Sequence, residues 1–247
     1  IIDLKGGVLF PGFIDSHTHL MIFAYLLNAI DLAPPRIKNI DDIIRAVRTS
    51  VGEHQHGEWI TGSRFVEYSL AENRYPNRYD LDEVSPDTPV ILYHTSFHAC
   101  VLNSRALKEM DLDRNSKTPV GGIIEKDSAT GELTGVLHDS AMFRVFDHLF
   151  VRDLKAMTKD ARIKMCSNAM GKFAEAGIVA VSDALVIPES FSIYQDTLDA
   201  GKASVRVYAM PELTVSDALI NTGIKTGFGN DMLKIGSIKI FEDGGMS

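Results

Sequence analysis

The feature that most constrains this chain is a pair of histidines, His17 and His19, at the end of an apolar run that reads FPGFIDSHTHL over residues 10–20. The run is typical of a β-strand, in which residues i and i+2 point to the same face. The two imidazoles are therefore expected to converge at the end of the strand. Neutral imidazole is the commonest protein ligand of transition metals, and two of them at about 2.0–2.1 Å make half of a zinc site. The alternative is a strand that ends in two solvated histidines, and metal binding is the interpretation we favour.

Strand-like apolar runs alternate with helical patterns in most of the chain, which indicates βαβ units and a parallel sheet. The expected strands are 8–19, 178–182, 205–210 and 235–241, and the expected helices are 20–29, 41–51, 154–176 and 191–200, with a short one within 216–226.

The middle of the chain, residues 53–149, lacks this alternation. It contains an expected strand at 89–93, a short helix at 104–110 and a hairpin whose turn is at 128–131. About a hundred residues are too many for one loop of a compact domain, so this segment is expected to be an inserted subdomain.

Bulk properties exclude several classes of function. The net charge of −8 over 247 residues, without a Lys/Arg cluster, argues against a nucleic-acid partner. The longest apolar run, residues 20–27, is far shorter than the roughly 20 residues that span a membrane. Cys100 and Cys166 form no CxxC pair. Two such cysteines suit a reducing compartment, and we expect a cytoplasmic protein.

The segment PGFIDSHTH, residues 11–19, resembles the metal motif of the amidohydrolase superfamily. Further motifs recur in the same order in its N-substituted formamide deformylase-like (YtcJ-like) branch. They are GEWI at 57–60, PNR at 76–78 with LD at 81–82, His98 with NS at 103–104 and AL at 106–107, GG at 121–122, TGE at 130–132 with TG at 134–135, and KIF at 239–241 with DG at 243–244. The resemblance extends over residues 3–246.

The resemblance implies a (β/α)8 TIM-type barrel, an α/β fold, of which about the first four βα units are present. Residues 9–52 and 150–247 are expected to form this first half of the barrel. Residues 53–149 are expected to be a mixed α/β insertion over the barrel mouth, and 1–8 a remnant of the N-terminal β-sandwich. The sequence has no initiator Met and stops at Ser247. We therefore expect a natural protein that is longer at both ends, and a signal peptide stays an open alternative.

Lys239 lies near the end of the fourth expected barrel strand, on the face where barrel active sites are built. In binuclear members of the superfamily a lysine at this strand reacts with CO2, and the carbamate bridges two metals. The resemblance thus implies His17, His19 and Lys239 as metal ligands, with the general acid/base aspartate beyond Ser247. The reaction needs a neutral amine, and the apolar neighbours of Lys239 are expected to desolvate it. The alternative is a lysine that extends from the strand end into solvent.

Four further residues are candidates for the surroundings of the metal or the substrate. Asp15 shares the histidine face and is expected to hold an imidazole N–H. His98 faces the substrate in the resembling branch, although a structural histidine is the alternative. Asp183, at the end of the second barrel strand, is either an acid that supports the metal ligands or a helix N-cap. Asp243 is expected to line the pocket.

Other positions carry weaker expectations. Asp139 occupies a position where the branch has a glutamate. We expect Asp139 to take over the role of that glutamate with its shorter side chain. Among the other histidines, His54 and His56 are expected to be solvated, and His94 and His148 structural.

The resemblance implies hydrolysis of the C–N bond of a small amide or formamide by a metal-activated hydroxide. The implied cofactors are one or two divalent ions, with zinc expected, and CO2 as the lysine carbamate. The implied partner is the small-molecule amide, with no nucleic acid or membrane, and a homo-oligomer is possible. Alternatives are other reactions of the superfamily, namely deaminase, cyclic amidase or phosphoesterase chemistry, and an inactive half-barrel fragment.

Overall fold

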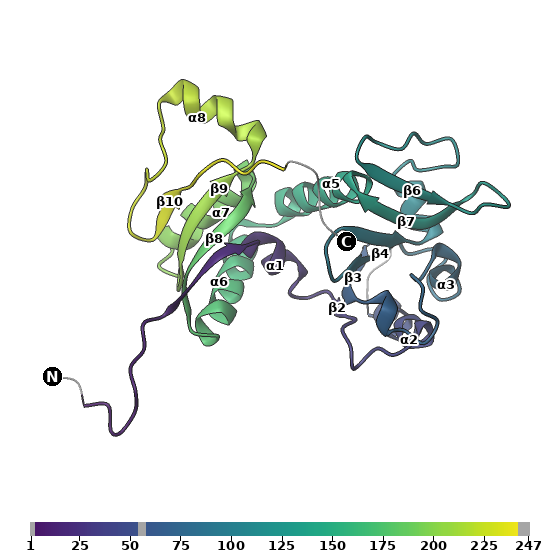
Figure 1. Ribbon diagram of the computed structural model, residues 1–247, viewed down its shortest axis with the longest axis horizontal. Helices are drawn as coiled ribbons and strands as arrows, with labels where there is room; N and C mark the ends of the chain where they lie inside the picture. Colours follow the sequence, from purple (N-terminus) through teal and green to yellow (C-terminus); the bar gives the residue numbers. More distant parts are fainter. Residues whose placement is uncertain (1–2, 54–57, 242–247) are drawn as a thin grey trace. The chain divides into compact units, whose positions relative to one another are not determined.

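The computed structural model describes residues 3–53 and 58–241 (Figure 1). These residues form two compact units, one made of the chain up to Leu27 with 151–241, the other of 28–150. The boundary differs from the expected one, which assigned 28–52 to the barrel. Those residues belong to the second unit because their helix packs its apolar face into that unit's core.

The first unit is built on a four-stranded sheet of order β1-β8-β9-β10. All its strand pairs are parallel. The strands are β1 (Phe13–Thr18), β8 (Ile178–Val186), β9 (Arg206–Pro211) and β10 (Leu233–Ile235), and the helices are α1 (Leu20–Leu26), α6 (Lys159–Glu175), α7 (Pro188–Asp199) and α8 (Ser216–Thr222). This βα alternation confirms the predicted α/β class. Among the described strands the sheet stays open, with β1 and β10 as its edges.

Three expectations for this unit differ from the structure. Residues 3–8 form no strand, because the described residues offer them no sheet partner. The single helix expected over 154–176 is two helices, because α5 (Ser140–Ala156) ends and Thr158 caps α6 by accepting the N–H of Ala161 at 3.2 Å. The last strand ends at Ile235 instead of running to Phe241.

The second unit is built on a six-stranded mixed sheet of order β2-β3-β4-β5-β7-β6. The first three strands are parallel and the others antiparallel. The strands are β2 (Ile30–Asp31), β3 (Ile60–Phe65), β4 (Val90–His94), β5 (Ala99–Leu102), β6 (Gly122–Lys126) and β7 (Leu133–Asp139), and the helices are α2 (Ile40–Val51), α3 (Arg78–Asp82), α4 (Ser104–Glu109) and the greater part of α5. Short 3-10 turns occur at Glu67–Ser69 in this unit and at Leu213–Val215 in the first unit.

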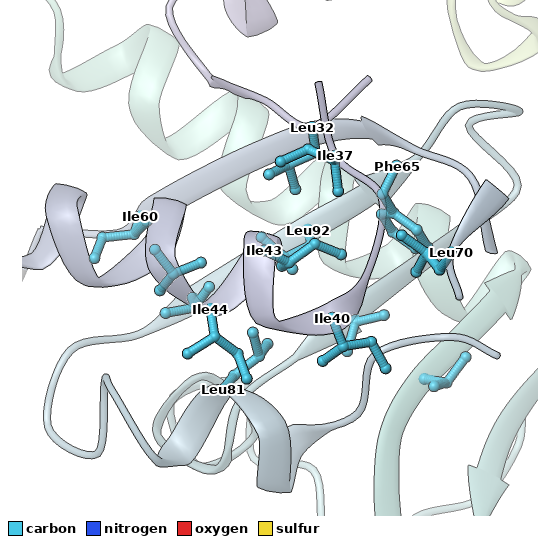
Figure 2. Close-up of a cluster of buried hydrophobic side chains, with 14 residues drawn as sticks. Leu32, Ile37, Ile40, Ile43, Ile44, Ile60, Phe65, Leu70, Leu81 and Leu92 are labelled. Atoms are coloured by element: carbon cyan, nitrogen blue, oxygen red, sulfur yellow. The ribbon is translucent and has the colours of Figure 1, made fainter. Parts of the chain in front are cut away.

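The core of the second unit lies between α2 and the sheet (Figure 2). Ile43 and Val47 of α2 are fully buried there, as is Leu92 of β4. The helix begins after Asn39, whose side chain accepts the N–H of Asp42 at 2.8 Å. Asn39 is therefore the N-cap, and α2 begins one residue before the expected start at residue 41.

None of the helices within residues 3–53 and 58–241 is both long and apolar enough to cross a membrane.

Candidate metal centre

Strand β1 carries His17 and His19 to the carboxyl end of the first unit's sheet. β1 pairs in parallel with β8, with Thr18 opposite Asp183, and its register shifts between Asp15 and Thr18. The two imidazole rings lie edge to face with their centroids 5.5 Å apart. His17 is exposed and His19 is half-buried. Both rings therefore lie close together where β1 ends and α1 begins, as the sequence predicted.

The His19 ring has the electrostatics of a metal ligand. Its Nδ1 atom is buried and has no hydrogen-bond partner in the described part of the chain. Burial lowers the pKa of His19 below 6.5. A hydrogen bond with the backbone of Ala184 raises this pKa, and the nearby charges of His17 and Lys239 lower it further. A lowered pKa keeps the imidazole neutral at pH 7, which is the form that binds metals. A buried nitrogen without a partner on a neutral ring fits a metal ion.

Lys239 lies at the same edge of the sheet although β10 has already ended. Its backbone N–H donates to the carbonyl oxygen of Pro211 at 2.7 Å, and it forms a parallel bridge with Glu212. Its Nζ lies 4.7 Å from the centroid of the Phe241 ring, a distance at which an ammonium is attracted by the ring face. The expected apolar enclosure is wrong in the described residues, because Ile240 and Phe241 are 64% and 50% exposed.

Asp183 is the buried acid of this region, only 2% exposed. Its Oδ2 accepts the backbone N–H of Met21 at 3.4 Å and the hydroxyl hydrogen of Tyr194. Burial raises the pKa of Asp183 to about 6, although the hydrogen bonds from Tyr194, Met21 and Leu20 oppose the shift. Asp183 is not the N-cap of a helix, because β8 continues to Val186 and Ile187 is the N-cap of α7; its carboxylate instead accepts an N–H from the first turn of α1. Tyr194 had no signal in the sequence, because a tyrosine within an amphipathic helix reads as ordinary core.

Asp15 behaves differently from the expectation. Its Oδ1 accepts the backbone N–H of His17 at 3.1 Å, so that it stabilises the turn of the main chain and does not hold an imidazole. Such local contacts are common because an Asp side chain readily reaches the backbone two residues on. Asp243 lies outside the described residues, as do His54 and His56.

The second unit contains a separate pair, His98 and Asp139. His98 Nδ1 lies 2.8 Å from Asp139 Oδ1, and the backbone N–H of Asp139 donates to the carbonyl oxygen of His98 at 2.8 Å. Asp139 has a φ of 48°, a left-handed conformation that is uncommon outside glycine. The sequence named both residues but did not show that they pair, because they are distant in the chain and meet only when β5 and β7 align.

Two further histidines of this unit, His94 and His148, were expected to be structural. His94 is buried, with Nε2 2.7 Å from Glu67 Oε2, and burial lowers its pKa against the opposing effect of Glu67. His148 is exposed on α5.

No cluster of three or more His, Cys, Asp or Glu side chains that could hold a metal occurs within residues 3–53 and 58–241. His17 and His19 with Lys239 are fewer side chains than the roughly four ligands that a zinc site takes.

Known proteins are similar to this chain in sequence. The profile of the amidohydrolase family matches residues 1–247. An N-substituted formamide deformylase from Arthrobacter pascens is 28% identical over 252 residues, covering 98% of this chain and 46% of the enzyme. YtcJ from Bacillus subtilis (strain 168) is 38% identical over 140 residues, covering 57% of this chain and 26% of YtcJ.

A solved structure shares the fold. An uncharacterized metal-dependent hydrolase from Pyrococcus horikoshii OT3 superposes with a TM-score of 0.65 at 23% identity, over 92% of this chain and 42% of the hydrolase. The chain spans less than half the length of the relatives that it matches. Since the family profile covers every residue, the chain belongs to the amidohydrolase family.

Proposed function

We propose that this chain carries the histidine end of a metal centre that hydrolyses the C–N bond of a small amide, with N-substituted formamides as the first substrates to test. The observation that carries the proposal is the buried, unpartnered Nδ1 of His19 beside the His17 ring. The similarity to an N-substituted formamide deformylase supports the choice of substrate class.

His17 and His19 would hold a divalent ion, for which zinc is the expected metal. When bound, such an ion lowers the pKa of water from 15.7 to about 7 and polarises a carbonyl oxygen. The neutral state of His19 leaves a nitrogen lone pair available at pH 7. These rings lie at the carboxyl end of parallel strands. Barrel enzymes bind their substrates at that end of the strands. We accordingly propose that the four parallel strands belong to a (β/α)8 barrel.

Lys239 would complete the chain's contribution as a carbamate formed with CO2. Its backbone is fixed at the sheet edge by the hydrogen bond to Pro211, and its charge already acts on His19. A carbamate would reverse that charge from positive to negative and so turn a group that repels cations into a ligand.

The second unit contributes a pair of its own, His98 and Asp139. The carboxylate of Asp139 lies 2.8 Å from Nδ1 of His98. His98 is 23% exposed, so its ring is reachable from solvent.

The test is metal content and substrate preference together. Protein purified without chelator would be analysed for zinc per chain, beside the variant His17→Ala/His19→Ala as the matched control. We expect wild-type protein to hold at least one zinc-like ion and the double variant to hold none. Hydrolysis would then be assayed with N-substituted formamides, aminopurines and phosphotriesters. Exclusive deamination or phosphoester cleavage would reject the proposed amide substrate, while the proposed metal centre would stand.

A half-barrel without catalysis of its own is the second candidate. It is favoured by the exposed apolar side chains at the β1 edge, where Phe13 and Ile14 are 68% and 72% exposed. Unpaired apolar strand edges are poorly tolerated. Absence of bound metal even after addition of zinc with bicarbonate would favour this candidate over the hydrolase.

A further inference from the structure

We propose that Asp183 and Tyr194 are positioning residues for His19, acting through the first turn of helix α1 and not through the imidazole itself. The proposal rests on the proposed metal centre, because it assigns the support of one of its ligands. It concerns residues of the first unit only.

Helix α1 begins directly after His19, which occupies the N-cap position and supplies no capping hydrogen bond from its side chain. The first N–H groups of a helix have no partner within the helix, and buried ones need an acceptor. Leu20 and Met21 are 0% and 3% exposed, so water does not supply that acceptor. The carboxylate of Asp183 does so from β8, by accepting the N–H of Met21 at 3.4 Å.

Asp183 is itself held by Tyr194 of α7. The tyrosine is 2% exposed and donates its hydroxyl hydrogen to the same Oδ2 atom. Burial and the neighbouring Asp183 raise the pKa of Tyr194 well above 10, so it remains a hydrogen donor at every working pH. The carboxylate is thus anchored on one side by a helix of the scaffold and on the other side by the helix that follows the metal motif.

The His19 ring is oriented by a hydrogen bond with the backbone of Ala184, the residue after Asp183 on β8. Metal-binding histidines usually donate their second nitrogen to a carboxylate, a backbone carbonyl or water, which orients the ring. Asp15, the nearest acid in sequence, is engaged with the backbone of His17. The hydrogen bond with Ala184 requires the His19 backbone to stay in place against β8, and Asp183 fixes that backbone through the first turn of α1.

The first experiment compares zinc affinities by competition with a chromophoric chelator. Asp183→Ala removes the cap and should weaken zinc binding about 10- to 100-fold, the range seen when the outer support of a ligand is lost. Asp183→Asn keeps an acceptor oxygen and should retain most of the affinity. Tyr194→Phe removes the hydrogen bond that holds the carboxylate of Asp183. Its loss of zinc affinity should lie between the losses of Asp183→Asn and Asp183→Ala.

Thr158→Ala is the matched control. Thr158 caps α6 in the same unit through one side-chain hydrogen bond to the N–H of Ala161. The variant should lower the melting temperature without changing zinc affinity. A loss of affinity equal to that of Asp183→Ala would assign the effect to general destabilisation and overturn the proposal.

A second readout needs no metal. In wild-type protein the His19 ring should give one set of sharp side-chain NMR signals, and these should shift or broaden in Asp183→Ala and Tyr194→Phe but not in Thr158→Ala. Unchanged His19 signals in both variants overturn the positioning role. If wild-type protein binds no zinc, the proposed metal centre fails on its own, while the ring signals still decide whether Asp183 orients His19. Should Asp183→Ala not fold, Tyr194→Phe carries both comparisons.

Discussion

The backbone N–H of Lys239 donates a 2.7 Å hydrogen bond to the carbonyl oxygen of Pro211, four residues after β10 has ended. This bond and the bridge to Glu212 return the chain to β9 and hold Lys239 at the carboxyl edge of the sheet. The lysine thereby reaches the neighbourhood of the His17 and His19 rings, where its charge lowers the pKa of His19.

Replacement of Lys239 should therefore alter metal binding in a way that depends on CO2. We expect bicarbonate to raise zinc uptake by wild-type protein. Lys239→Ala and Lys239→Arg should show no bicarbonate effect, because neither side chain forms a carbamate, while the arginine keeps the positive charge. Carbon-13 NMR with labelled bicarbonate would detect the carbamate directly. Equal uptake by all three proteins with and without bicarbonate would contradict the ligand role.

The raised pKa of Asp183 predicts a specific pH dependence of stability in chelator-treated protein. The folded value is about 6 and the ordinary value 3.8, so between pH 4 and 6 the native state binds more protons than the unfolded chain. The free energy of unfolding should therefore fall as pH rises through that window, by about 3 kcal/mol in total from this group.

Asp183→Asn should lack this component. Urea unfolding of both proteins at several pH values between 4 and 7 would measure it, since the contributions of other groups cancel in the difference. A difference between the two proteins that does not change with pH would show that Asp183 is ionised in the folded protein at pH 4.

Asn103 should be one of the most sensitive positions of the second unit. It is fully buried, its Oδ1 accepts the N–H groups of Val90 and Ala106, and its Nδ2 donates to the carbonyl oxygens of Ser85 and Thr88. Asn103→Ala leaves these buried groups without partners and should cost about 3 kcal/mol.

The isosteric Asn103→Asp should also be strongly destabilised, because a carboxylate cannot donate to the two carbonyls. Asn39→Ala, which removes a single cap bond from α2, is the control and should cost only about 1 kcal/mol. Denaturant unfolding measures all three, and equal costs for Asn103→Ala and Asn39→Ala would refute the four-bond role.

Both thiols should be unreactive in the folded protein. Cys100 and Cys166 are 0% exposed, and burial raises the pKa of Cys166 to about 11 and that of Cys100 further above 9. The thiolate is the reactive form, so an aromatic disulfide reagent at pH 8 should label neither until urea is added. Cys100 lies in the second unit and Cys166 in the first, so the order of labelling shows which unit opens first. Rapid labelling of native protein would disprove the burial of that thiol.

Local sequence was sufficient wherever one segment decides its own structure. The hairpin β6–β7, helix α4 and strand β8 followed by a helix were all predicted, because turn residues and apolar runs act over a few positions. The same holds for the convergence of His17 and His19, which follows from the two-residue period of a strand. The sequence did not predict helix α5 or strand β3. Their apolar patterns fit either a helix or a strand, and only the surface against which they pack decides between the two.

The sequence by itself determined the α/β alternation and the two histidines of the candidate centre, because these depend on period and local motif, and the family followed from the resemblance of its motifs. Only the tertiary structure decided that α2 belongs to the second unit, that Asp139 pairs with His98, that Asp15 binds the backbone, and that Asp183 and Tyr194 meet at the first turn of α1. In each of these contacts, the local sequence pattern does not determine which group the side chain meets. Parallel strands bring together residues that are separated by more than a hundred positions in the chain. Which acceptor a buried donor finds is settled only when the sheet has formed.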